Sequence, residues 1–160
     1  MRLASDRVER CDGFGTATKF GVGTSPQDLI NADFNGDGKP DLATANPGSD
    51  NVSVLLGDGS ENFGAAKNFA TGKTPKHLTK ADFNRDGKLD LAVSNDGSDN
   101  ISVLLGKDYG GFGAPKDFNG GSNGNGIASA SINSDAKPDL AVANGSEASV
   151  LINISKKKRR

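Results

Sequence analysis

The sequence of 160 residues contains no tryptophan, one cysteine and one histidine. The single cysteine, Cys11, cannot form a disulfide within the chain, so cysteine content indicates no redox compartment. The single histidine, His77, has no nucleophile or carboxylate at a recognisable spacing, and therefore gives no signature of a catalytic triad. Without tryptophan there is little stacking surface for sugars or bases. These shortages argue against a triad enzyme and weaken a lectin interpretation.

Long apolar stretches are also missing. No window of 18 apolar residues occurs, which excludes a membrane-spanning helix. The first ten residues lack the apolar run of a secretory signal, and we expect residues 1–11 to be a flexible lead. The basic run at 156–160 lies within an expected tail, residues 155–160, and no basic stripe or surplus of aromatic residues accompanies it. No nucleic-acid partner is predicted.

An acidic motif is the most informative feature that is present. In residues 82–90, oxygen-bearing side chains occupy positions 1, 3, 5 and 9, and a glycine occupies position 6. Residues 33–41 repeat the pattern, and residues 131–139 carry a degraded copy. Clustered carboxylates repel one another unless a cation lies among them, and calcium prefers many oxygen ligands at flexible geometry. The motif therefore predicts Ca²⁺ as the cofactor of these loops.

The first two loops supply the candidate metal ligands, with the backbone carbonyl contributing at position 7. They are Asp33, Asn35, Asp37, Lys39 and Asp41 in the first loop, and Asp82, Asn84, Asp86, Lys88 and Asp90 in the second. A loop of the EF-hand type would need an acidic ligand at position 12, where Thr44 and Val93 stand, and a helix afterwards. The sequence favours a β-hairpin loop over that alternative.

The third loop has a poorer ligand set. Ser131 replaces the first carboxylate, and Ala136 replaces the glycine, which costs about 1 kcal/mol if φ must be positive there. The remaining candidate ligands are Asn133, Asp135, Lys137 and Asp139. A hairpin that keeps its shape without a metal is the alternative for this loop.

The motif recurs at a fixed interval. Asp33, Asp82 and Ser131 are separated by 49 residues each, and Phe14, Phe63 and Phe112 follow the same period, as do Phe20, Phe69 and Phe118. A period of about 40–50 residues is typical of propeller blades with four strands. We predict three tandem repeats, at residues 12–60, 61–109 and 110–154, which form one partial β-propeller.

Each repeat contains short apolar and alternating segments that predict strands, and the 22 glycines favour tight turns over helices. The expected class is therefore all-β, with blades of four antiparallel strands. In this scheme residues 14–20 are an orphan outer strand, and residues 148–152 lack an outer neighbour. Three blades are fewer than the four to eight that usually close a ring. Either a homo-oligomer closes the propeller, or the chain is a fragment of a longer one.

These motifs resemble the FG-GAP repeat family, also called VCBS-type repeats, which forms the β-propeller of integrin α subunits. The resemblance rests on the pairs Phe14-Gly15, Phe63-Gly64 and Phe112-Gly113, on Gly113-Ala114-Pro115, and on the acidic loops. It covers about residues 12–154. It implies a calcium-loaded hairpin between the first two strands of each blade, and an extracellular or secreted location.

The function expected from this resemblance is a non-enzymatic, calcium-binding module for extracellular protein binding or adhesion. Repetition of the acidic pairs argues against glycosidase carboxylates, because a catalytic pair need occur only once. Two alternatives remain: a carbohydrate-binding, lectin-like propeller, and an accessory propeller fragment of a larger secreted enzyme. The sequence leaves the natural protein or glycan ligand undetermined.

Overall fold

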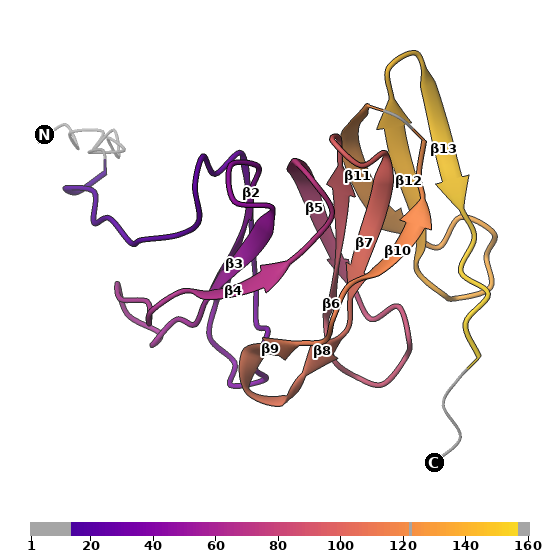
Figure 1. Ribbon diagram of the computed structural model, residues 1–160. Helices are drawn as coiled ribbons and strands as arrows, with labels where there is room; N and C mark the ends of the chain where they lie inside the picture. Colours follow the sequence, from indigo (N-terminus) through magenta and orange to yellow (C-terminus); the bar gives the residue numbers. More distant parts are fainter. Residues whose placement is uncertain (1–13, 122, 157–160) are drawn as a thin grey trace, which may run out of the picture.

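The computed structural model describes residues 14–121 and 123–156, which form three antiparallel sheets (Figure 1). The first sheet consists of β1 (Asp28–Ala32), β2 (Asp41–Asn46), β3 (Asn51–Leu55) and β4 (Lys67–Ala70). The second consists of β5 (Pro75–Ala81), β6 (Asp90–Asn95), β7 (Asn100–Leu104) and β10 (Lys116–Asn119). The third consists of β11 (Gly124–Ala130), β12 (Asp139–Asn144) and β13 (Glu147–Leu151). The predicted all-β class is confirmed.

A small hairpin lies apart from the three sheets. It pairs β8 (Gly106–Lys107) with β9 (Gly111–Phe112) across the 3₁₀ turn η1 (Asp108–Gly110). One repeat earlier, an isolated bridge between Gly57 and Phe63 occupies the equivalent place. Phe-Gly pairs therefore mark the return of the chain from the third strand towards the outer strand.

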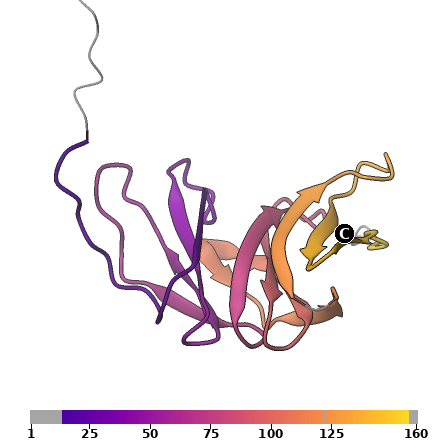
Figure 2. The ribbon, with the colours of Figure 1, turned by 90° about the horizontal axis from the view of Figure 1, so that it is seen from above.

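The sheets follow one another in an arc, from the first sheet to the third (Figure 2). One apolar cluster fills the junction between the first and second sheets and includes Val52, Val54, Leu91 and Leu104. Another fills the junction between the second and third sheets. Every residue of β6 is buried, because the second sheet is covered on both faces. The arrangement is that of propeller blades, and the described residues do not close a ring.

The outer strand of each of the first two sheets belongs to the sequence repeat that follows the one containing its other three strands. β4 pairs with β3, although the predicted repeat boundary lies between them at residue 60, and β10 pairs with β7 in the same way. The prediction that residues 14–20 form a strand was wrong: this segment has no assigned strand. A lone segment cannot form a ladder, and no third strand of a preceding sheet lies beside it in the described chain. Residues 12 and 13 lie outside the described part.

The first strands of neighbouring sheets contact each other at the same repeat position. The side chain of Lys80 donates to the backbone carbonyl of Asn31, and the hydroxyl of Ser129 donates to the carbonyl of Lys80 over 3.0 Å. Leu78 N–H donates to Oδ2 of Asp28 over 3.0 Å. These bonds fix the position of each first strand along its own axis relative to the first strand of the next sheet. They therefore also set the relative positions of the acidic loops, which follow the first strands.

Candidate metal sites in the acidic loops

Each acidic loop connects the first strand of a sheet to the second. Residues 33–40 join β1 to β2, residues 82–89 join β5 to β6, and residues 131–138 join β11 to β12. The loops therefore sit between the first two strands, as the family resemblance implied. Because the sheets are related by the repeat, the three loops occupy equivalent places.

Hydrogen bonds within the first loop hold its polar side chains inward. Oδ1 of Asp33 accepts from the N–H of Gly36 over 2.7 Å, and Oδ2 accepts from the N–H of Gly38 over 2.7 Å. Asn35 Nδ2 donates to Oδ2 of Asp37 over 3.0 Å, and Oδ1 of Asp37 accepts from the N–H of Lys39 over 2.9 Å. Three oxygen-bearing side chains at positions 1, 3 and 5 thus share one tight, exposed turn.

The second loop repeats this arrangement. Asp82 accepts from the N–H groups of Asp86 and Gly87 over 3.0 and 2.8 Å. Asn84 donates to Asp86 over 3.0 Å, and Asp86 in turn accepts from the N–H of Lys88 over 3.0 Å. Four predicted ligands of this loop therefore lie close together. The match between two loops 49 residues apart shows that the motif specifies its own geometry.

Left-handed backbone at positions 4 and 6 makes the tight turn possible. The φ values are 78° and 80° at Gly36 and Gly38, and 60° and 90° at Arg85 and Gly87. Glycine adopts this conformation without the steric cost that a Cβ adds. The backbone at position 6 thus favours glycine, as the sequence indicated.

The carboxylate at position 9 differs from the others, because it is completely buried in all three loops. Oδ2 of Asp41 accepts from the N–H of Phe34 over 2.8 Å, and Oδ1 accepts from the N–H of Gly57 over 2.9 Å. Asp90 makes the same two bonds with Phe83 and Gly106, at 2.9 and 2.8 Å. Position 9 therefore ties the loop to the segment after the third strand, a structural role that the sequence analysis did not assign.

The 49-residue period also contains an indication of the structural role of the carboxylate at position 9. Gly57 and Gly106 recur at the 49-residue period, directly after the third strands. A Cβ on Gly57 would lie 2.2 Å from the carbonyl oxygen of Pro40, and one on Gly106 would lie 2.2 Å from that of Leu89. Only glycine brings its N–H close enough to the buried carboxylate without moving the loop.

The pKa shifts follow the surroundings of each carboxylate. The N–H of Gly38, helped by those of Gly36 and Asp37, holds the pKa of Asp33 below its ordinary value. Burial raises the pKa of Asp90 to about 6, against the opposing effect of the N–H groups of Gly106 and Phe83. The carboxylate of Asp33 is therefore ionised at neutral pH and can accept a cation.

The third loop carries its own positive charge. Nζ of Lys137 lies 3.2 Å from Oδ2 of Asp135 and donates to the carbonyl of Asn153 over 3.3 Å. The N–H of Lys137 is the leading cause of the lowered pKa of Asp135. Ser134 and Ala136 adopt φ values of 61° and 59°, so the strain expected at Ala136 is present. An ammonium group thus neutralises the carboxylate at position 5 of this loop.

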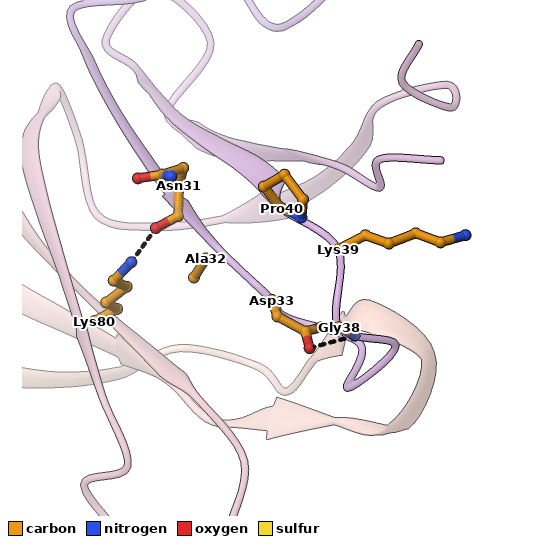
Figure 3. Close-up of a pocket in the computed structure, with 7 residues that line it drawn as sticks. All are labelled: Asn31, Ala32, Asp33, Gly38, Lys39, Pro40 and Lys80. Carbon is orange, nitrogen blue, oxygen red and sulfur yellow. Dashed lines mark hydrogen bonds between the residues drawn. The ribbon is translucent and has the colours of Figure 1, made fainter. Parts of the chain in front are cut away.

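A cavity of about 360 Å³ lies beside the first loop (Figure 3). Its lining combines Asp33, Gly38, Lys39 and Pro40 with Asn31 and Ala32 of β1 and with Lys80 of β5. In Figure 3 the Lys80 side chain reaches from the second sheet to Asn31, while Asp33 turns towards Gly38. The first loop is therefore open to solvent at the junction of two sheets.

The donor set of the first two loops fits a hard cation. All side-chain donors are carboxylate or amide oxygens, and a carboxylate oxygen that accepts one N–H keeps a lone pair for another partner. Among the described residues no three carboxylate, histidine or cysteine side chains converge on one point. Amide and backbone oxygens, namely Asn35 with Lys39 and Asn84 with Lys88, would thus have to complete the ligand set.

The fold and the repeated loops define the class: a repeat protein with propeller-like blades. A model of the FG-GAP-like repeat matches residues 33–93 and 82–142, and the chain belongs to this family. A search of the curated proteins found no significant match. Within the described residues, no helix has the length and apolar character needed to cross a membrane.

Proposed function

We propose that this chain is a calcium-stabilised, non-catalytic propeller module that binds a protein partner or serves adhesion outside the cell. The observation that supports it most is the hydrogen-bond pattern shared by the first two loops, in which Asp33 and Asp82 accept from equivalent N–H groups. Asp and Asn also shape ordinary turns, but the same three oxygen-bearing side chains recur in both loops 49 residues apart, which supports a shared ligand. Family membership agrees with a binding module rather than an enzyme.

Calcium in this proposal stabilises the hairpins. In each of the first two loops Asp33 or Asp82, Asn35 or Asn84, and Asp37 or Asp86 would bind the ion, with the carbonyl at position 7. The ion offsets the repulsion between the clustered carboxylates. Extracellular calcium modules have dissociation constants of about 10⁻⁴–10⁻³ M, and a tenfold excess over that constant stabilises by about 1.4 kcal/mol per site.

The partner surface would lie on the loops, which vary on a rigid scaffold. The acidic loops all leave their sheets at the ends of the first strands, so they share one side of the arc. Calcium fixes the conformation of this side and lowers the entropy lost on binding.

Calorimetric titration of chelator-treated protein tests the calcium proposal. We expect two calcium ions per chain, one after Asp86→Ala, and still two after Asp135→Ala, because Lys137 already neutralises Asp135. No binding at millimolar calcium would refute the proposal, and equal losses from both variants would show that the third loop also binds. Arrays of extracellular proteins and of glycans, probed with calcium-loaded protein, separate an adhesion module from a lectin.

A further inference from the structure

The third sheet exposes a face that is buried in the other two. Phe34, Val52 and Val54 of the first sheet pack against the second sheet, and Phe83, Ile101 and Val103 pack against the third. In the third sheet Ile132 follows Phe34 and Phe83 at the 49-residue period, and Val150 corresponds to Val54 by register, because it pairs with Ala141 as Val54 pairs with Ala43. Val150 is 51% exposed where Val54 is 0% exposed, and Ile132 is 44% exposed where Phe34 is 5% exposed. Nothing in the described chain covers this face.

The first sheet leaves part of the opposite half of the same junction exposed. Leu78 and Leu91 of the second sheet pack against the first sheet, and Leu29 and Leu42 are their counterparts one repeat earlier. Leu29 is 54% exposed, whereas Leu78 is 4% exposed. Leu55, the counterpart of Leu104, is already buried, so the exposed part of this face centres on Leu29. The two ends of the arc therefore carry the two complementary faces that pack together at each internal junction.

The third sheet also lacks an outer strand within the described residues. β4 and β10 pair with β3 and β7, whereas β13 has only β12 as a neighbour. An open edge presents unpaired backbone groups that a further strand can use. By the 49-residue period, residues 14–20 correspond to 63–69 and 112–118, which end in the outer strands.

Residues 14–20 are already held where an outer strand belongs. The ring of Phe20 meets that of Phe63 edge-on at 5.3 Å, and Phe69 meets Phe112 in the same way at 5.3 Å. The segment thus occupies the place of the outer strand of a sheet that would precede the first. In the described chain no backbone hydrogen bond holds it.

The register of the missing pairing follows from the other two sheets. Phe69 lies opposite Val52, which pairs with Ala45, and Phe118 lies opposite Ile101, which pairs with Ser94. In the third sheet the equivalent pair is Ala143 with Ala148, because its hairpin is two residues shorter. Phe20 is therefore placed opposite Ala148 and Lys19 opposite Ser149. Lys19 would then be the diagonal neighbour of Glu147 on one face of the sheet, a favourable pair of charges. The edge and the segment match in pattern and in charge.

We propose that two copies of this chain associate head to tail. The exposed face of each third sheet packs on the first sheet of the other copy, and residues 14–20 of each copy pair with β13 of the other. Three sheets in each copy give a ring of six blades, within the usual range of four to eight. Heterologous contacts of this kind close when the rotation between copies allows it. The association needs no ligand and is independent of the proposed calcium function.

The molar mass in solution tests the association. Light scattering over a range of protein concentrations should give the mass of two chains. Val150→Glu puts a charge into the new junction and should give single chains that stay folded by circular dichroism, because Val150 is exposed in one copy. Tyr109→Glu adds the same charge at an 83% exposed site away from both end faces and should leave the pair intact. A single-chain mass at all concentrations, a mass that grows without limit, or equal effects of both variants would overturn the proposal.

Disulfide trapping tests the register. In a Cys11→Ser background, Lys19→Cys with Ser149→Cys places two thiols directly opposite, within disulfide range, and should give linked pairs on a non-reducing gel. Thr18→Cys with Ser149→Cys is the matched control, because neighbouring residues of a strand point to opposite faces. Absence of linked pairs, or equal linking in the control, would contradict the proposed pairing.

Discussion

The N–H of Gly57 donates to Oδ1 of the buried Asp41 over 2.9 Å. The other oxygen of Asp41 accepts from Phe34 at the start of the same loop. One carboxylate therefore joins the loop to the segment that follows β3. Asp90 does the same in the second sheet. This arrangement separates the carboxylates that shape the fold from those that face solvent.

Replacing Asp90 should weaken the fold whether or not calcium is present. Asp90→Ala leaves two buried N–H groups without an acceptor, which costs about 2–5 kcal/mol in the free energy of unfolding. Asp86→Ala removes an exposed side chain and should matter only with calcium, by about 1.4 kcal/mol under tenfold excess. Urea unfolding of both variants with calcium and with chelator measures this. A loss for Asp90→Ala that vanishes in chelator would show that its role is metal binding alone.

Relief of strain in the third loop should stabilise the protein. Ala136 has a φ of 59°, so Ala136→Gly should gain about 1 kcal/mol, or about 2–4 °C in melting temperature. Gly87→Ala is the matched control, because φ is 90° at the equivalent position of the second loop, and should lose a similar amount. Thermal melts in chelator isolate the backbone effect. A melting temperature that falls in Ala136→Gly would contradict the assigned strain.

A buried threonine should be accepted at Val93. Thr44 donates to Oδ1 of Asn46 over 3.0 Å. One repeat later Val93 takes the place of Thr44, and Oδ1 of Asn95 has no hydrogen-bond partner among the described residues. Val93→Thr supplies the missing donor, so we expect a change within about 0.5 kcal/mol of zero. Val54→Thr, in a fully buried apolar position, should lose about 1–3 kcal/mol. Similar losses in the two variants, measured by urea unfolding, would refute the assignment.

Breaking the ion pair in the third loop should raise the pKa of Asp135. Lys137→Met removes the charge beside Asp135 but keeps most of the aliphatic stem. We expect the pKa of Asp135 to rise part of the way towards its ordinary value, because the side chain of Lys137 contributes to lowering it. The rise is partial, because the leading cause of the lowered pKa is the backbone N–H of Lys137, which remains in the variant. Carboxyl-carbon NMR titration follows this residue, with Asp33 as an internal reference. An unchanged pKa of Asp135 would mean that the ammonium has little influence there.

Periodicity predicted most of the architecture. The 49-residue interval and the alternating segments predicted repeated blades of short antiparallel strands, and the family resemblance placed the acidic loops between first and second strands. Such features depend on local pattern, which a sequence displays directly. The expected strand at 14–20 failed because a strand exists only with a partner, and pattern alone does not supply one.

Roles that depend on distant contacts were not visible in the pattern. Asp41 and Asp37 look alike in the motif, but burial against Gly57 gives Asp41 a structural role. The Lys137 side chain was not expected to neutralise Asp135, because position 7 was assigned through its carbonyl alone. In both cases the decisive neighbour comes from tertiary packing or rotamer choice, which spacing in the sequence does not encode.

The outer strand of each of the first two sheets lies in the next 49-residue period of the sequence. The boundaries of the sequence repeats therefore do not coincide with the boundaries of the folded sheets. A gene segment that encodes residues 12–60 would specify three strands of one sheet and a segment destined for another. Insertion or loss of a whole 49-residue period, wherever the break falls, still joins a third strand to an outer strand. Chains built this way can change their number of blades through recombination at almost any point without creating a faulty junction.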